Sequence, residues 1–259
     1  MILQNKTVVI CGVGPGLGRE VAEKSLRDGA RVVLAARTAA KLEELAKQLD
    51  PTGESVACVP TDLTDQGQCD ALGAAACERF GGVDALVQVA ALDTVFGSLA
   101  EAPLEDFQRT FDTNVVGPIR LARAVAPLMK KQAGGGSIVL VGSQAMLHPQ
   151  TPQVAYGASK GGLLSAMYYM AKELGPDKIR VNMVVPTWMW GPPVEAYTKM
   201  TARQRGCGVD EVIAEITAGM PLGEIPKDDD VAEAIVFFAS DRSRMITGQR
   251  LLVNAGELM

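Results

Sequence analysis

The sequence predicts an α/β protein with a doubly wound parallel sheet of about seven strands, helices on both faces and a substrate lid. Strand-like apolar runs alternate with helical patterns almost to the end of the chain. The runs are short, continuous and rich in Val, which is typical of strands covered by helices on both faces. Helical connections of this kind join parallel strands through right-handed crossovers. The 259 residues fit one domain, 1–259, which can bury roughly 70–75% of its unfolded surface.

The strands are expected where β-branched and apolar residues form short runs. These runs are Thr7–Cys11, Arg31–Ala36, Ser55–Pro60, Val83–Val89, Ser137–Val141, Ile179–Val185 and Arg250–Val253. Helices are expected between them, for example where Leu42, Leu45, Ala46 and Leu49 share one helical face. The helical segments are Leu17–Asp28, Lys41–Leu49, Gln66–Phe80, Leu104–Lys131, Val154–Leu174 and Asp229–Ala239.

One long segment interrupts the alternation of strands and helices. Residues 187–227 are rich in Pro, Gly and Met and separate the sixth strand from the last helix. A connection of this length is usually functional, so we expect a substrate-binding lid within the same domain.

Composition narrows the possible functions. A formal net charge of −5 gives no electrostatic footprint for nucleic acid or an anionic membrane, so a small-molecule substrate is expected. His148 is the only histidine, so zinc sites built on several histidines are excluded and no metal is expected. No apolar stretch reaches the ~18–20 residues of a membrane span, and the N-terminus lacks the pattern of a signal peptide. Five cysteines without a C-x-x-C pair are typical of a reduced compartment, and we expect a cytoplasmic protein.

A glycine-rich turn lies between the first strand and the first helix. The segment Cys11–Arg19 reads C-G-V-G-P-G-L-G-R. Glycines allow a tight turn and close approach to a pyrophosphate, whose charge is met by the N-terminus of the helix. We therefore expect cofactor contacts from five residues of the turn: Gly12, Gly14, Gly16, Leu17 and Gly18.

The end of the second strand bears on the choice between NAD and NADP. An acidic residue there would hold the adenosine ribose 2′-hydroxyl, but Ala36 stands at this position and Arg37 follows it. A guanidinium can bind a 2′-phosphate, so NADP is favoured over NAD. The alternative is that Arg37 is a solvated surface residue, in which case NAD remains possible.

Tyr156 and Lys160 lie four residues apart at the start of a strongly helical segment, on one helix face. A neighbouring cation favours the phenolate and lowers the pKa of tyrosine toward the working range of an acid/base. Ser143 ends the preceding strand, so its hydroxyl can face the same pocket and bind a carbonyl oxygen. Together these residues predict proton transfer at a hydroxyl or ketone.

Combined with the glycine turn, these residues make the sequence resemble the short-chain dehydrogenase/reductase family over essentially the whole chain. The fold expected for that family is Rossmann-like, and the family's T-G-x-x-x-G-x-G turn appears here with Cys11 in place of Thr. The resemblance implies a catalytic tetrad made of Asn114, Ser143, Tyr156 and Lys160. It implies further cofactor contacts from Asp62, Leu63, Ala90, Tyr156, Lys160, Pro186 and Met189.

The resemblance also implies a role for each residue of the tetrad. Tyr156 would be the acid/base, and Ser143 would orient and polarise the substrate oxygen. Lys160 would bind the nicotinamide ribose and depress the pKa of Tyr156. Asn114 would hold a backbone distortion and a water that links Lys160 to solvent.

The sequence departs from the family's motifs at three places, all of which affect how the cofactor is held rather than the catalytic tetrad. The family's N-N-A-G is Gln88–Ala91 here, its P-G after the sixth strand is Pro186–Thr187, and Gly191 replaces a Thr that often contacts the carboxamide.

The substrate is expected to be bulky and apolar, because large aromatic and thioether side chains cluster around the predicted pocket. A steroid-like, terpenoid or aryl secondary alcohol or ketone would fit. The expected substrate-binding residues are Val95, Met146, His148, Trp188, Trp190 and Tyr197. A structural role for His148 is an open alternative, as is packing of the lid against the body or another subunit.

Two other functions remain possible at this stage. One is an NAD-dependent dehydrogenase of an aromatic-ring cis-diol, which needs the same tetrad. The other is a non-catalytic, cofactor-sensing protein, although Tyr156 and Lys160 are both present. The resemblance implies a homotetramer, or a dimer, formed through the segments Leu104–Lys131 and Val154–Leu174.

Overall fold

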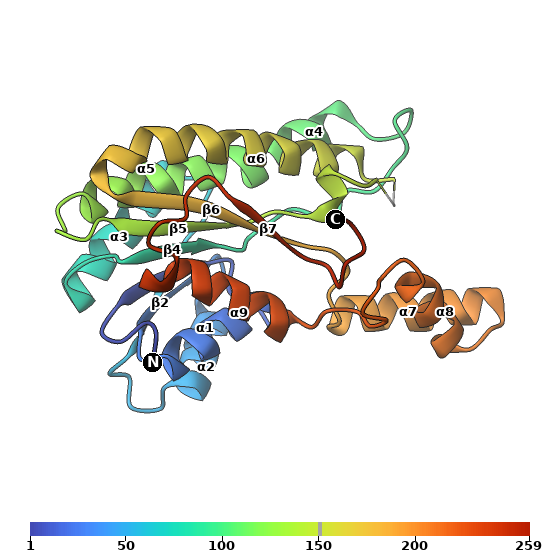
Figure 1. Ribbon diagram of the computed structural model, residues 1–259, viewed down its shortest axis with the longest axis horizontal. Helices are drawn as coiled ribbons and strands as arrows, with labels where there is room; N and C mark the ends of the chain where they lie inside the picture. Colours follow the sequence, from blue (N-terminus) through green and yellow to red (C-terminus); the bar gives the residue numbers. More distant parts are fainter. Residues whose placement is uncertain (150–151) are drawn as a thin grey trace.

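A single parallel sheet of seven strands, in the order β3-β2-β1-β4-β5-β6-β7, forms the centre of the protein (Figure 1). A computed structural model describes residues 1–149 and 152–259. The strands are β1 (Thr7–Cys11), β2 (Arg31–Ala36), β3 (Val56–Pro60), β4 (Ala85–Gln88), β5 (Gly136–Val141), β6 (Ile179–Pro186) and β7 (Arg250–Val253). The predicted fold class, a doubly wound Rossmann-like sheet, is confirmed.

Helices cover both faces of the sheet (Figure 1). On one face lie α1 (Leu17–Arg27), α2 (Ala39–Leu49) and α9 (Asp228–Ala239). On the other lie α3 (Gln66–Phe80), α4 (Leu104–Phe111), α5 (Gly117–Met129) and α6 (Val154–Leu174). Val9 of β1 packs in the core under the second group, whereas Val8 and Ile10 pack in the core under the first. All three side chains are fully buried, which is why the strands are continuously apolar in sequence.

The segment expected as one helix over Leu104–Lys131 is divided in the structure. Between α4 and α5, residues Asp112–Val116 form a π-helix. This wider turn contains Asn114, and such bulges in helices are frequently found at functional sites. β4 is also shorter than expected, beginning at Ala85 and ending at Gln88.

The predicted lid contains two helices, α7 (Pro192–Arg205) and α8 (Val209–Thr217), which stand apart from the layered body (Figure 1). Two contacts fix the base of this segment. The backbone N–H of Trp190 donates to the carbonyl of Pro226, 2.7 Å away, and Trp190 forms an isolated parallel bridge with Lys227. Thr187 donates a hydrogen bond to Glu257 near the C-terminus. The lid is thus held beside the start of α9.

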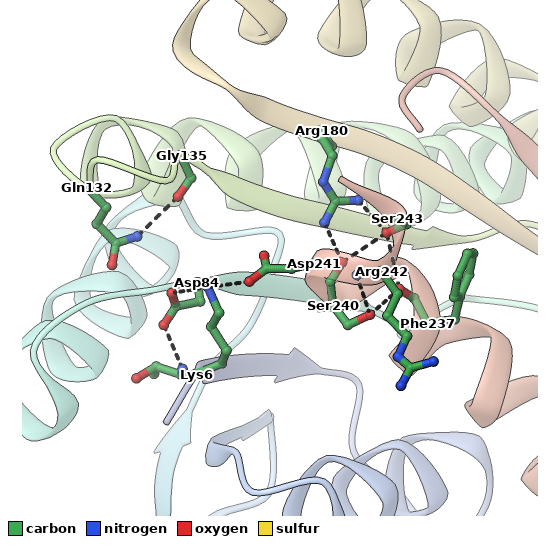
Figure 2. A network of polar contacts seen from close by, with 11 residues as sticks. Lys6, Asp84, Gln132, Gly135, Arg180, Phe237, Ser240, Asp241, Arg242 and Ser243 are labelled. Atoms are coloured by element: carbon green, nitrogen blue, oxygen red, sulfur yellow. Dashed lines mark hydrogen bonds and ion pairs between the residues drawn. The ribbon is translucent and has the colours of Figure 1, made fainter. Parts of the chain in front are cut away.

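A network of polar contacts lies at the end of the sheet where the parallel strands begin (Figure 2). Arg180 of β6 donates to the carbonyls of Phe238 and Ser240 and to the hydroxyl of Ser243, which fixes the C-terminal end of α9 to the sheet. Lys6 pairs there with Asp84 and Asp241. The residues that the sequence predicts for the cofactor and the reaction lie at the other end of the sheet, beyond the carboxyl ends of the strands.

The described helices include none with the length and apolar character needed to cross a lipid bilayer.

Candidate active site

The glycine-rich turn after β1 needs glycine for reasons of space as well as conformation. Gly12 has φ +101°, and a Cβ on it would lie 2.1 Å from the backbone nitrogen of Ala90. A Cβ on Gly18 would lie 2.6 Å from the carbonyl oxygen of Gly12. These two glycines bring the turn close to β4 and to α1. Around Gly14, by contrast, the space for a Cβ is open, so its backbone is free to face a ligand.

A cavity of about 840 Å³ lies beyond this turn at the carboxyl ends of β1, β2, β3 and β4. Its walls include most of the residues expected at the nucleotide half of the cofactor: Gly12, Gly14, Arg37, Asp62, Leu63 and Ala90. The Asp62 carboxylate accepts from the backbone N–H and the hydroxyl of Thr64, and these bonds lower its pKa, with a smaller contribution from Arg37. Arg37 itself is exposed at the rim. The residues present fit the adenosine portion of a dinucleotide.

A second cavity, of about 510 Å³, holds the reactive residues. It is lined by Ser143 and Tyr156, by Gly16 and Leu17 at the start of α1, and by Met189. Asp93 lines both cavities, so they adjoin. A dinucleotide that spans them would place its pyrophosphate at the N-terminus of α1 and its nicotinamide beside Tyr156.

Ser143, Tyr156 and Lys160 come together because β5 ends beside the first turns of α6. Ser143 caps a short 3₁₀ turn, where its hydroxyl accepts from the backbone N–H of Ala145 at 3.2 Å, and it lines the same cavity as Tyr156. Lys160 is 1% exposed, and its Nζ donates to the carbonyl of Val141, 2.8 Å away. The same Nζ lies 5.6 Å from the centre of the Tyr156 ring. Burial lowers the pKa of Lys160 to about 8, partly offset by the charge of Asp93.

The expected lowering of the Tyr156 pKa is wrong for this structure. The pKa of Tyr156 is raised to about 12, mainly by burial and to a smaller extent by the charge of Asp93, while the Ser143 hydroxyl acts in the opposite direction. The phenolate is poorly solvated here, and the ammonium of Lys160 is bound to a carbonyl oxygen and is itself destabilised by burial. The raised pKa keeps the Tyr156 phenol protonated at neutral pH.

Asn114 is buried in the π-helix and fixes the loop after β4. Its side-chain Nδ2 donates to the carbonyl of Leu92 and to the hydroxyl of Ser159, each 3.0 Å away. Its Oδ1 accepts from the backbone N–H of Leu92 at 2.7 Å. Asn114 therefore connects the segment that contains Asp93 to α6, which carries Tyr156 and Lys160.

Several of the expected site residues do not line either cavity. Val95 is buried, and Met146 packs against the hydrophobic core. Trp190 bridges to Lys227, and Tyr197 stacks on Trp188 with ring centres 5.2 Å apart. Trp188 and His148 do line the reaction cavity. Among the expected cofactor residues, Gly18 and Pro186 also line neither cavity. Gly18 is buried against the glycine turn, and Pro186 is buried as the last residue of β6.

The sequence interpretation missed some residues of the reaction cavity. Asp93 and Gln153 line it, and Gln153 Nε2 donates to the carbonyl of Asp93 at 2.6 Å. Asp228, the first residue of α9, also lines it. The one sequence feature that could have drawn attention to Asp228 is the run of three aspartates at the start of the last helix. No periodicity marks Asp93 or Gln153, which lie in connections.

A glycine turn at a helix N-terminus, with Ser143, Tyr156 and the buried Lys160 brought together beyond it, is the arrangement that the resemblance to short-chain dehydrogenases/reductases implies. A family model described as enoyl-(acyl carrier protein) reductase matches residues 12–257. L-rhamnose 1-dehydrogenase (NAD(P)(+)) of Azotobacter vinelandii is 36% identical over 99% of this chain and 98% of its own length. Galactitol 2-dehydrogenase of Agrobacterium fabrum is 32% identical over the whole of both chains. A solved structure of a short-chain type dehydrogenase/reductase from Mycobacterium ulcerans superposes with TM-score 0.90, at 27% identity over 99% of this chain and 91% of that one.

The chain belongs to the short-chain dehydrogenase/reductase family, and it is an oxidoreductase. These relatives support a secondary-alcohol oxidoreductase that uses a nicotinamide dinucleotide.

Proposed function

We propose that the protein transfers a hydride between NADP(H) and a secondary alcohol or ketone, with Tyr156 as the acid/base. The observation that carries this proposal is that Ser143 and Tyr156 line one cavity, with the buried Lys160 Nζ 5.6 Å from the centre of the Tyr156 ring. The glycine turn at the start of α1 supports the dinucleotide.

Each residue has a distinct task in this proposal. The bound nicotinamide supplies or accepts the hydride. Ser143 donates a hydrogen bond to the substrate oxygen, and Tyr156 Oη gives that oxygen a proton in reduction or removes one in oxidation. Lys160, whose Nζ lies 5.6 Å from the centre of the Tyr156 ring, would bind the nicotinamide ribose. Asn114 positions the loop after β4 against α6.

NADP is proposed over NAD on the basis of Arg37. This side chain lines the nucleotide cavity, and the Asp62 carboxylate in the same wall accepts hydrogen bonds from Thr64. We expect Arg37→Ala to raise the KM for NADPH by about tenfold or more while leaving the KM for NADH within about twofold, because one bidentate contact to the 2′-phosphate is lost.

Steady-state kinetics with both cofactors check this prediction. Arg109→Ala is the control. Arg109 lines the same cavity but belongs to α4, whereas Arg37 directly follows β2, so this variant removes an equal charge from another part of the wall. Equal use of both cofactors by the parent enzyme would contradict the proposal.

The substrate is proposed to be a bulky secondary alcohol with one apolar side. Trp188, Met189 and the residues Pro192–Val194 give the cavity an apolar wall. The lining also contains the polar residues Asp93, Gln144 and Gln153, which favours a polyhydroxylated substrate as a second candidate. The names of the two curated relatives, which act on a sugar and a polyol, support this second candidate.

A substrate panel separates the candidates. Aryl, terpenoid and steroid alcohols and ketones, aldoses and polyols, and an aromatic-ring cis-diol are each offered with NADP(H) and NAD(H), and absorbance of the reduced nicotinamide is followed. We expect turnover of at least one secondary alcohol or its ketone. Binding of cofactor without turnover of any member would favour the non-catalytic, cofactor-sensing alternative.

The proposal also covers the closure of the lid, the number of subunits and the compartment of the protein. We propose that residues 187–227 close over the substrate within one domain, 1–259. We propose a homotetramer, or a dimer, in the cytoplasm, with the segment from α4 to α5 and helix α6 at one subunit contact. Exposed apolar side chains on these helices, such as Leu104, Val154 and Tyr169, support this contact, whereas Met167 packs in the core of its own chain.

A further inference from the structure

Asp228 places an unpaired carboxylate in the wall of the reaction cavity. It shares that wall with Ser143, Tyr156, Met189 and Gly16. A Cβ on Gly191 would lie 2.9 Å from Oδ2 of Asp228, and a Cβ on Gly16 would lie 3.1 Å from the same oxygen. The carboxylate therefore occupies the space that side chains at these two positions would need. The absence of a side chain at both glycines is what lets it reach the cavity.

The start of α9 is held in this place by the lid. The hydrogen bond from Trp190 to Pro226 and the bridge between Trp190 and Lys227 bring the segment after β6 beside the residue that precedes α9. The backbone N–H of Lys227 in turn donates to Asp230 at 2.8 Å, which fixes the first turn of α9. Asp228 thus faces the cavity because of well-defined backbone contacts.

The surroundings of Asp228 leave its charge without a partner. In the part of the chain that the structure describes, it accepts no hydrogen bond and forms no ion pair, and burial raises its pKa above the ordinary value for aspartate. Of the neighbouring charges on α1 and α9, Glu20 is also acidic, and Lys24 is paired with Asp229 and Glu233. A carboxylate that is only partly solvated and has no cation beside it is stabilised when a positive charge arrives.

We propose that Asp228 discriminates between the two oxidation states of the cofactor, binding the oxidised form more tightly relative to the reduced form. This inference rests on the nicotinamide cofactor proposed above. The oxidised nicotinamide ring carries a positive charge and the reduced ring is neutral, whereas the pyrophosphate is the same in both. A carboxylate in the wall of the cavity that also contains Tyr156 therefore favours the oxidised form, and any repulsion of the pyrophosphate affects both forms equally.

The test is a ratio of dissociation constants, measured without turnover. Isothermal titration calorimetry, with the fluorescence of Trp188 as a second readout, gives Kd for NADP+ and NADPH and for NAD+ and NADH. We expect Asp228→Asn to raise the ratio of Kd(oxidised) to Kd(reduced) by about tenfold, the size of one charge–charge contact in a partly solvated site. The matched control is Asp229→Asn, which removes the same charge from the next residue, where the carboxylate pairs with Lys24 instead. It should leave the ratio within about twofold.

Three results would overturn the inference. An unchanged ratio in Asp228→Asn, with both Kd values shifted equally, would mean that the carboxylate acts only on the pyrophosphate. An equal change of the ratio in Asp229→Asn would assign the effect to the overall charge of the first turn of α9. Failure of the parent protein to bind any of the four nucleotides would remove the proposed cofactor as well, which distinguishes that failure from the first two. Circular dichroism and thermal melting show that each variant is folded.

Discussion

Tyr156→Phe lowers kcat by about 10²–10⁴-fold, the usual contribution of a positioned general acid or base, and leaves Kd for the cofactor within about threefold. The variant keeps the ring that packs in the reaction cavity and loses only the hydroxyl bonded to Ser143. Stopped-flow or steady-state kinetics with a substrate found by the panel measure the loss. Tyr169→Phe, an exposed tyrosine on the same helix, is the matched control and should retain full kcat.

The pH profile gives a second readout of the same residue. Because burial raises the pKa of Tyr156 to about 12, the phenol is protonated at neutral pH, which suits ketone reduction. Alcohol oxidation needs the phenolate, so its rate rises with pH until the pKa of the cofactor-bound enzyme is reached. Tyr156→Phe should abolish this rise. A pH-dependent oxidation that survives in Tyr156→Phe would assign the proton transfer to another group.

Lys160→Met lowers kcat/KM by about 10²-fold or more and does not lower stability at neutral pH. The ammonium lost in this variant is fully buried and bonded to the carbonyl of Val141. Methionine fills nearly the same volume without a charge that must be removed from water. Activity therefore falls without a loss of stability, which a residue with a purely structural role would not produce.

The stability effect of Lys160 depends on pH in a defined direction. Folding lowers its pKa from 10.5 to about 8, so between these values the unfolded chain binds more protons than the folded one. Stability therefore rises with pH across this window, and the penalty of roughly 3 kcal/mol is present in full below pH 8. Thermal melting of the parent protein and of Lys160→Met, compared from pH 7 to pH 10, measures this difference.

The matched control for this pair of effects is Lys172→Met, which removes an exposed lysine from the last turn of the same helix. It should change neither kcat/KM nor the dependence of stability on pH. A Lys160→Met variant that melts well below the parent protein at pH 7 would contradict the account of a desolvated ammonium.

Much of the fold could be predicted because the sheet is buried on both faces. The bounds of α3, α6 and β7 agree with their sequence patterns at both ends. The π-helix at Asp112–Val116 could not be predicted, because apolar periodicity does not distinguish one wider turn within a long helical segment. The two helices of the lid were also missed, since the segment was identified only by its length and by its Pro, Gly and Met content.

The site residues could be predicted where reactive side chains lie close together in the sequence as well as in the structure. Tyr156 and Lys160 are four residues apart on one helix, and Ser143 ends the strand that precedes it. Trp190 and Tyr197 were expected in the pocket because they are large and near it in sequence, but neither lines the cavity: the Trp190 backbone pairs with Lys227, and the Tyr197 ring contacts Trp188. Asp228 was missed because its position in the cavity depends on two distant glycines. Contacts of this kind arise only from tertiary packing.

Transfer of a deuterium label tests the central claim most directly. Reduced cofactor carrying deuterium at the transferable C4 position is incubated with the ketone that the parent enzyme accepts, and the product is analysed by mass spectrometry. The account predicts one deuterium on the carbinol carbon of the product with the parent enzyme and with Tyr169→Phe, and almost none in the same time with Tyr156→Phe. Product without the label, or labelled product formed at the parent rate by Tyr156→Phe, would contradict it.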